Sequence, residues 1–238
     1  MTIFYITGTS SGIGKAIAEQ ALQNDDSIVY GFSRTCCIQH TNYIHKVVDL
    51  SNVDEVINLN IVKHPEAYKV VLINNAGTIG EIKPLGKQTN ESIVNVFNIN
   101  TICPVILANK FIQTYNGLDV SIVIINISSG AARHPIESWA PYCASKAAID
   151  MFSQVLQAEN GYEASNIKVF SVAPGIVDTN MQLQVRASNP KDFMHHEKFV
   201  GYKKNGQLVT PESVAQKILK IAEKPLDHQN VLVDVREH

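Results

Sequence analysis

The chain has 238 residues, of which 45% are hydrophobic and 18% are charged. This composition supplies a packed core and excludes an intrinsically disordered protein. The formal net charge of −2 excludes a general nucleic-acid-binding protein, because such proteins need a dense basic surface.

Neither a membrane partner nor export is expected. No uninterrupted run of about 18 apolar residues occurs, and a strand pattern that begins at Ile3 leaves no room for a secretory signal. The four cysteines (Cys36, Cys37, Cys103 and Cys143) form no C-x-x-C pair. We therefore interpret them as ordinary side chains of a cytoplasmic protein in a reducing compartment.

Seven short apolar segments rich in Val and Ile alternate with helical patterns along the chain. The predicted strands cover residues 3–7, 27–33, 43–48, 69–74, 120–127, 168–173 and 231–235. The predicted helices cover residues 14–23, 90–115, 141–159 and 211–223. The last of these helices has Thr210 as its N-cap and Pro211 in its first position. Strands that are hydrophobic along their whole length are covered on both faces. We therefore predict a single-domain α/β fold, a doubly wound parallel sheet of Rossmann type with about seven strands and helices on both faces.

Residues 180–206 depart from this alternation, because they are polar and carry little periodicity. Irregular insertions of this length are usually functional lids or disordered. We interpret the segment as a lid of short helices over the substrate. The single domain would then have a cofactor half at about 1–127 and a catalytic and substrate half at about 128–238.

A glycine-rich turn follows the first strand, with the sequence Thr7-Gly8-Thr9-Ser10-Ser11-Gly12-Ile13-Gly14. Glycine lets the backbone turn tightly or approach a ligand, and the N-terminus of the following helix offers free N–H groups and a positive dipole to a pyrophosphate. We predict dinucleotide contacts from Gly8, Ser10, Gly12, Ile13 and Gly14. A turn that binds nothing is the alternative.

The end of the second strand carries a cation, Arg34, and no acidic residue lies within positions 32–35. An acidic residue here would bind the adenosine ribose of NAD, whereas a cation pairs with the 2′-phosphate of NADP. We therefore predict NADP(H) as the cofactor, with a solvated surface charge as the alternative for Arg34. Asp49, at the end of the third strand, is predicted either to meet the adenine amino group or to cap the helix before Asp54.

Five motifs occur in one order along the chain, and together they resemble the short-chain dehydrogenase/reductase family. They are Thr7-Gly8-x3-Gly12-Ile13-Gly14, Asn74-Asn75-Ala76-Gly77, Ser128-Ser129, Tyr142-x3-Lys146 and Pro174-Gly175-x3-Thr179. The Tyr-x3-Lys motif alone is common by chance, but all five in register are not.

The types of residue in the fourth motif suit acid chemistry. A phenol with a pKa near 10 keeps its proton at neutral pH, and a nearby cation draws that pKa toward the working pH. Tyr142 and Lys146 lie four residues apart on a predicted helix, so they share one face. The resemblance further implies that Lys146 holds the nicotinamide ribose and that Ser129 binds the substrate carbonyl and stabilises a developing oxyanion.

The resemblance implies several further roles. Asn100 matches the asparagine that supports a proton-relay water, with Asn95 and Asn98 as nearby alternatives. Other cofactor contacts are implied for Asn75, Ala76, Gly77, Pro174, Gly175, Ile176 and Thr179, the last four at the nicotinamide carboxamide.

The C-terminal third contains Pro174-Gly175-Ile176-Val177-Asp178-Thr179-Asn180-Met181-Gln182 followed by Arg186, and later Gly206-Gln207-Leu208-Val209 and Ser213-Val214-Ala215-Gln216-Lys217. These segments resemble the sepiapterin reductase and benzil reductase branch of the family. Predicted substrate contacts are Ser129, Trp139, Met181 and Asp234. Asp234 matches an aspartate that anchors a pterin, or it is a charged residue at an exposed strand end. Trp139 either lines the substrate pocket or packs under the lid. Asn180 stands where most sepiapterin reductases have aspartate, which leaves the substrate open.

The function expected from these residues is NADPH-dependent reduction of a ketone, an α-diketone or a pterin side-chain carbonyl, with Tyr142 as proton donor. The alternatives are an NAD-linked secondary alcohol dehydrogenase and a non-catalytic dinucleotide-binding protein. The resemblance also implies a homodimer or a tetramer. No metal site is expected, because His195 and His196 have no partner at ligand spacing.

Overall fold

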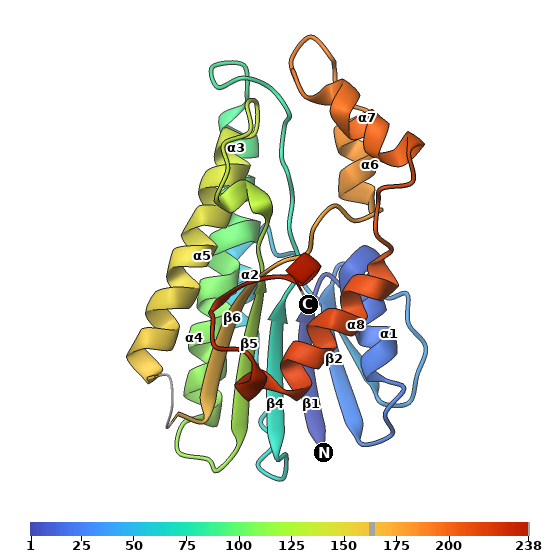
Figure 1. Cartoon of the computed structure of the whole chain (residues 1–238). Coiled ribbons are helices and arrows are strands. Elements are labelled where there is room, and N and C mark those ends of the chain that lie inside the picture. The colour runs from blue at the N-terminus through green and yellow to red at the C-terminus, as the bar shows by residue number, and fades with distance from the viewer. Residues whose placement is uncertain (162–164, 238) are drawn as a thin grey trace.

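The computed structural model describes residues 1–161 and 165–237. Seven parallel strands form one sheet in the order β3-β2-β1-β4-β5-β6-β7 (Figure 1). The strands are β1 (Thr2–Thr7), β2 (Ser27–Ser33), β3 (Tyr43–Val47), β4 (Lys69–Asn74), β5 (Ser121–Ile127), β6 (Ile167–Ala173) and β7 (Leu232–Asp234). This arrangement confirms the predicted doubly wound parallel sheet.

Helices cover both faces of the sheet, as Figure 1 shows. On one face lie α1 (Gly12–Ala21) and α8 (Pro211–Glu223). On the other lie α2 (Val53–Asn58), α4 (Cys103–Tyr115) and α5 (Ala140–Asn160). The remaining helices, α3 (Asn90–Phe97), α6 (Asn180–Arg186) and α7 (His196–Lys204), extend beyond the carboxyl ends of the strands.

Strand β1 shows why the strands are hydrophobic throughout. Ile3 and Tyr5 belong to the core on the α4 side, whereas Phe4 and Ile6 belong to the core on the α1 and α8 side. Successive side chains of a strand point to opposite faces, so a sheet with helices on both faces needs apolar residues at every position.

The helix predicted over residues 90–115 is continuous in outline but not regular. A π-helical turn, Asn98–Ile102, separates α3 from α4. By length and composition the stretch Asn90–Tyr115 is apolar enough to cross a membrane. However, Leu107, Ala108 and Phe111 are buried against the sheet, which is the packing of a core helix.

The other boundaries differ modestly from the prediction. Helix α1 begins two residues earlier than expected, α2 was not predicted, and β7 has three residues instead of five. Thr210 caps α8 as predicted, because its side chain accepts a hydrogen bond from the backbone N–H of Ser213. Two short helices, α6 and α7, form within the segment interpreted as a lid.

Candidate active site

Apart from the Tyr142-x3-Lys146 motif, which lies on α5, the predicted motifs lie at the carboxyl ends of strands, and parallel strands bring those ends to one edge of the sheet. The glycine-rich turn follows β1, and Arg34 follows β2. The Asn75 motif follows β4, Ser129 follows β5, and Pro174 follows β6. Ligands of open α/β sheets bind outside this edge.

Glycine is required in the turn after β1 for two physical reasons. Gly8 has φ +75° and Gly12 has φ +58°, in the left-handed region that favours glycine. Gly14 has ordinary backbone angles, but a Cβ there would collide with Asn75 Nδ2 and the Gly8 carbonyl. The turn is therefore shaped by close backbone packing.

The start of α1 fits an anionic group. Its N-cap, Ser11, makes no side-chain capping hydrogen bond, whereas the threonines that cap α3, α6 and α8 each accept one from a backbone N–H. The first N–H groups of α1 are thus not capped by their own N-cap side chain. Together with the helix dipole they suit a pyrophosphate, and Ser10, Gly12 and Ile13 lie partly exposed beside them.

The loops after β1 and β4 are joined by hydrogen bonds. The Thr7 hydroxyl accepts from the backbone N–H groups of Asn75 (2.9 Å) and Ala76 (3.0 Å). The Asn75 side chain donates to the Thr7 carbonyl at 3.0 Å. Two motifs that lie far apart in the sequence are therefore held side by side.

A polar network that we did not predict contacts the glycine-rich turn after β1 through Thr9. The Thr9 hydroxyl lies 2.8 Å from the Tyr43 hydroxyl and 3.3 Å from the Ser33 hydroxyl, and Ser33 also contacts His45 Nε2 at 3.0 Å. A Cβ on Gly31 would collide with the Tyr43 hydroxyl. The glycine within β2 was the one sequence signal for this close approach.

The predicted adenosine contacts lie at the edge of the sheet beyond β2. Arg34 is exposed, and its charge helps to lower the pKa of Asp49. The larger cause of that lowered pKa is hydrogen bonding from Ser51, whose N–H and hydroxyl both donate to the Asp49 carboxylate. Helix α2 is capped by Asn52 and not by Asp49, so the helix-capping alternative for Asp49 is wrong.

Tyr142 and Lys146 occupy one face of α5, as their spacing predicts. Both are buried, with 6% and 4% of their surface exposed. Lys146 Nζ lies 5.9 Å from the centre of the Tyr142 ring and donates a hydrogen bond to the Ile127 carbonyl at 2.7 Å. The ammonium is thereby tied to the end of β5.

Burial dominates the protonation of this pair. It raises the pKa of Tyr142 above its usual value, although a hydrogen bond with Ser129 acts in the opposite direction. Burial also lowers the pKa of Lys146 to about 8, against the Asp150 carboxylate, which raises it. The lowering of the phenol pKa that we expected from the cation is therefore not what sets it, because burial raises the pKa of Tyr142 instead. The phenol keeps its proton at neutral pH, as a proton donor must.

The loop that carries Ser129 is anchored by the buried carboxylate of Asp150. The Ser129 hydroxyl accepts a hydrogen bond from the Ala131 N–H at 3.2 Å. Asp150, one helical turn after Lys146, accepts from Arg133 Nε at 3.1 Å and from the Ser171 hydroxyl at 2.7 Å. Asp150 therefore links α5, β6 and the Ser129 loop, a role that the sequence did not indicate.

Asn100 lies within the π-helical turn and is buried, with 1% of its surface exposed. Its side chain accepts from the Thr78 N–H and donates to the Thr78 carbonyl, both at 2.9 Å, and donates to the Ser145 hydroxyl at 3.0 Å. Of the three asparagines considered, Asn100 is the one tied to both α5 and the loop after β4. Such π turns are frequent at functional sites.

Gly77 lies between the predicted catalytic and nicotinamide residues. A Cβ on Gly77 would lie 3.5 Å from both Asn100 Oδ1 and Lys146 Nζ, and 3.9 Å from Met181 Cε. The loop Pro174-Gly175-Ile176 is half-buried, and Thr179 ends it as the N-cap of α6. Met181 at the start of α6 therefore reaches the same point as the catalytic helix.

Trp139 is the N-cap residue of α5 and packs against Tyr142, with ring centres 5.7 Å apart. Phe193 stacks on the indole at 5.5 Å, and Phe199 of α7 lies 5.2 Å away. The indole both adjoins the phenol and packs under the lid, so the two alternatives for Trp139 are not exclusive. The sequence missed Phe193 and Phe199, because residues 180–206 carry no periodicity that would place them.

Asp234 ends β7, and its carboxylate is already paired. Arg236 donates to it from the backbone N–H and from Nε, both at 2.9 Å, and from Nη2 at 2.5 Å. The Arg236 side chain also lies against Gly175, where a Cβ would be 3.5 Å from its Cγ. The C-terminal end of the sheet thus adjoins the predicted nicotinamide loop.

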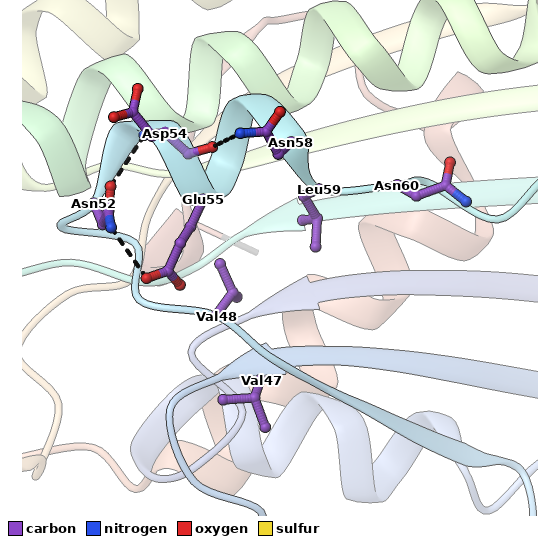
Figure 2. Close-up of a pocket in the computed structure, with 8 residues that line it drawn as sticks. All are labelled: Val47, Val48, Asn52, Asp54, Glu55, Asn58, Leu59 and Asn60. Atoms are coloured by element: carbon purple, nitrogen blue, oxygen red, sulfur yellow. Dashed lines mark hydrogen bonds between the residues drawn. The ribbon is translucent and has the colours of Figure 1, made fainter.

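In the described part of the chain, no group of three or more His, Cys, Asp or Glu residues could hold a metal ion. A hollow of about 400 Å³ lies between the end of β3 and α2, and Figure 2 shows the residues that line it. Its lining includes Asp54 and Glu55 and none of the predicted site residues, so its charge does not suit a nucleotide phosphate.

The comparisons with known proteins agree with this arrangement. The short chain dehydrogenase family model matches residues 2–190. A benzil reductase ((S)-benzoin forming) of Bacillus cereus is 34% identical, over 100% of both chains. A sepiapterin reductase of Rattus norvegicus is 29% identical, over 96% of this chain and 94% of its own.

A solved structure has the same fold. A short chain dehydrogenase/reductase of Saccharomyces cerevisiae superposes with a TM-score of 0.82, at 24% identity, over 99% of this chain and 96% of its own. With the motif order, the sheet topology and the family model in agreement, the chain belongs to the short-chain dehydrogenase family.

Proposed function

We propose that the protein reduces a ketone to an alcohol with NADPH, with Tyr142 as the proton donor. The observation that carries this proposal is the buried, protonated phenol of Tyr142, with the Ser129 hydroxyl as its hydrogen-bond partner and Lys146 on the same helix face. A reductase needs an acid at the carbonyl oxygen, and this phenol is one at neutral pH.

The residues at the carboxyl edge of the sheet support the proposed cofactor. A nicotinamide dinucleotide supplies the hydride when bound. The glycine-rich turn and the start of α1 would hold its pyrophosphate, and Arg34 would pair with a 2′-phosphate. Asp49 has a free acceptor capacity beyond its bonds to Ser51 and would meet the adenine.

The contacts of these residues support the proposed catalytic roles. Ser129 would hold the substrate oxygen beside the phenol, and Lys146 would bind the nicotinamide ribose while its charge favours release of the phenol proton. We propose that Asn100 acts by holding α5 against the loop after β4, since its side chain is engaged with Thr78 and Ser145. A proton-relay water would then be bound by backbone groups near Asn100 and not by its side chain.

For the substrate, we propose an α-diketone in preference to a pterin. The support is the similarity to benzil reductases along the whole chain and the pairing of Asp234 with Arg236. A carboxylate that already accepts three hydrogen bonds from Arg236 is less able to anchor an aminopterin. Trp139 and Met181 would line the substrate site.

We further propose a cytoplasmic homodimer, with a tetramer as the larger form. The outer surfaces of α3, the π turn and α5 expose apolar side chains, Val94, Ile102, Met151 and Val155, which a second copy would cover. The four cysteines are free thiols, as in a reducing compartment.

The test is an assay of the purified protein with NADPH and with NADH against benzil, sepiapterin and a simple monoketone. We expect oxidation of NADPH with benzil as the best substrate. A clear preference for NADH, or turnover only of secondary alcohols with NAD⁺, would replace the proposal with an NAD-linked alcohol dehydrogenase. No turnover of any carbonyl compound would leave a dinucleotide-binding protein.

A further inference from the structure

The indole N–H of Trp139 is a buried donor without an acceptor. Trp139 is only 6% exposed, and among the described residues its Nε1 is one of five buried side-chain atoms that have no hydrogen-bond partner. A buried polar group without a partner costs free energy, so each case in a native structure calls for an explanation. The position of this residue at the catalytic tyrosine suggests one.

The donor lies in apolar surroundings. The rings of Trp139, Tyr142, Phe193 and Phe199, which we call the aromatic cluster, pack against one another, with Ile79, Ile82 and Val185 in the same core. The Tyr142 hydroxyl and the indole N–H are the two polar groups of the four rings. The aromatic cluster therefore places two hydrogen-bond donors among apolar rings, where the lid packs on α5.

We propose that Trp139 Nε1 donates a hydrogen bond to the second carbonyl oxygen of a 1,2-dicarbonyl substrate, while Tyr142 serves the first. This inference rests on the proposed function and specifies how it selects its substrate. Hydride adds to the first carbonyl carbon and the Tyr142 proton goes to its oxygen, so that C=O becomes C–OH and the dinucleotide is oxidised. The second carbonyl is unchanged, and its oxygen gives the buried donor an acceptor.

This arrangement would explain selectivity as well as binding. A site built to hydrogen-bond a substrate group discriminates against an analogue that lacks the group, because its own buried polar atom is then left unpaired. The flat rings of Phe193 and Phe199 favour an aryl substituent beside the carbonyl, through offset or edge-on ring contacts. Both features favour an aryl 1,2-diketone over a monoketone of the same shape.

The first test compares benzil with deoxybenzoin, which has the same skeleton but one carbonyl oxygen fewer. For Trp139→Phe we expect the ratio of kcat/KM for benzil over deoxybenzoin to fall about tenfold relative to the wild type, the effect of one lost hydrogen bond. Phe199→Leu is the matched control, since it disturbs the same ring packing without removing a donor. It should lower both activities in parallel and keep the ratio. A ratio that Trp139→Phe leaves unchanged overturns the inference.

The second test needs no turnover and no variant. The chain has one tryptophan, so ¹⁵N-labelled protein gives a single indole N–H resonance. In the presence of NADP⁺, saturating benzil should shift this resonance downfield, and deoxybenzoin should not. No shift, or the same shift with both compounds, means that the indole bonds an ordered water instead and overturns the inference.

The two levels of the proposal fail differently. If the wild type reduces both compounds with NADPH but Trp139→Phe keeps the ratio, the inference fails and the proposed function stands. If the wild type reduces neither compound, the proposed function fails, and the inference fails with it.

Discussion

The edge of the sheet and the lid are held in place in different ways. At the edge, backbone groups and buried side chains form the contacts, as between Thr7 and Asn75 or between Lys146 and the Ile127 carbonyl. The lid is held by side-chain packing, with Phe193 buried against Trp139, and by surface pairs such as Lys87 with Asp192, in which the lysine is 63% exposed. Exposed pairs contribute about 0–1 kcal/mol each, so the packing of side chains is the main contact of the lid, whereas hydrogen bonds to the backbone hold the edge.

One strained residue connects the two regions. Ser138 has φ +69° although it is not glycine, and its hydroxyl donates to the Asp192 carbonyl of the lid at 2.5 Å. Trp139 follows directly and carries the ring that Phe193 covers. The difference teaches that the edge, where we propose that the cofactor binds, depends on backbone shape, whereas the proposed substrate site depends on side chains that the lid contributes.

The largest effect is expected where the two regions meet. Tyr142→Phe should lower kcat/KM for ketone reduction by at least about 100-fold, the contribution of general acid catalysis, and leave the NADPH affinity nearly unchanged. Steady-state kinetics and NADPH fluorescence titration measure the two quantities. Tyr68→Phe, at an exposed tyrosine before β4, is the control and should behave as the wild type. An unchanged rate for Tyr142→Phe would remove this residue as the acid.

At the cofactor edge, Arg34→Ala should raise the Kd for NADPH about tenfold, the loss of one charged hydrogen bond, and leave the Kd for NADH unchanged. NADH has no 2′-phosphate, so the two cofactors separate a specific contact from a general disturbance. Lys198→Ala removes an exposed cation from the lid instead and should change neither value. Equal weakening of both cofactors would assign Arg34 a structural role.

Two glycines test the rigidity of the two regions directly. Gly14→Ala should lower the free energy of unfolding by about 1–3 kcal/mol, because its Cβ would collide with Asn75 and the Gly8 carbonyl. Gly201→Ala, within α7 of the lid, meets nothing within 4 Å and should raise that free energy by about 0.5–1 kcal/mol, the difference in helix propensity. Urea denaturation measures the free energy of unfolding of both variants. A change of the same sign in both would contradict the difference in packing between the edge and the lid.

The smallest expected effect is a shift along the pH axis. Reduction should slow as the pH rises through the Lys146 pKa of about 8, since the neutral amine no longer favours proton release from Tyr142. The Asp150 carboxylate raises that pKa, so Asp150→Asn should move the alkaline decline of kcat/KM to lower pH. The exposed Asp119→Asn is the control. A decline that stays at the wild-type pH would show that Asp150 does not act through Lys146.

Much of this protein was readable from local sequence. Continuous apolar strands, the glycine turn after Thr7 and the four-residue spacing of Tyr142 and Lys146 predict the sheet, the edge and the catalytic pair. Each of these signals arises within a few residues of backbone and does not depend on distant partners. The predicted strand and helix ends were mostly correct to within two residues for the same reason.

Tertiary structure alone decided the rest. Several contacts depend on side chains that are distant in the sequence or lie in irregular segments. They are the hydrogen bonds of Asn100 in the π turn, those of Asp150, the pairing of Asp234 with Arg236, and the packing of Phe193 and Phe199 around Trp139. No periodicity encodes such contacts, because their partners are brought together only when the sheet, its helices and the lid pack. The sequence by itself therefore determines the family and the candidate catalytic pair, whose signals are local, and only the tertiary structure decides which side chains surround that pair.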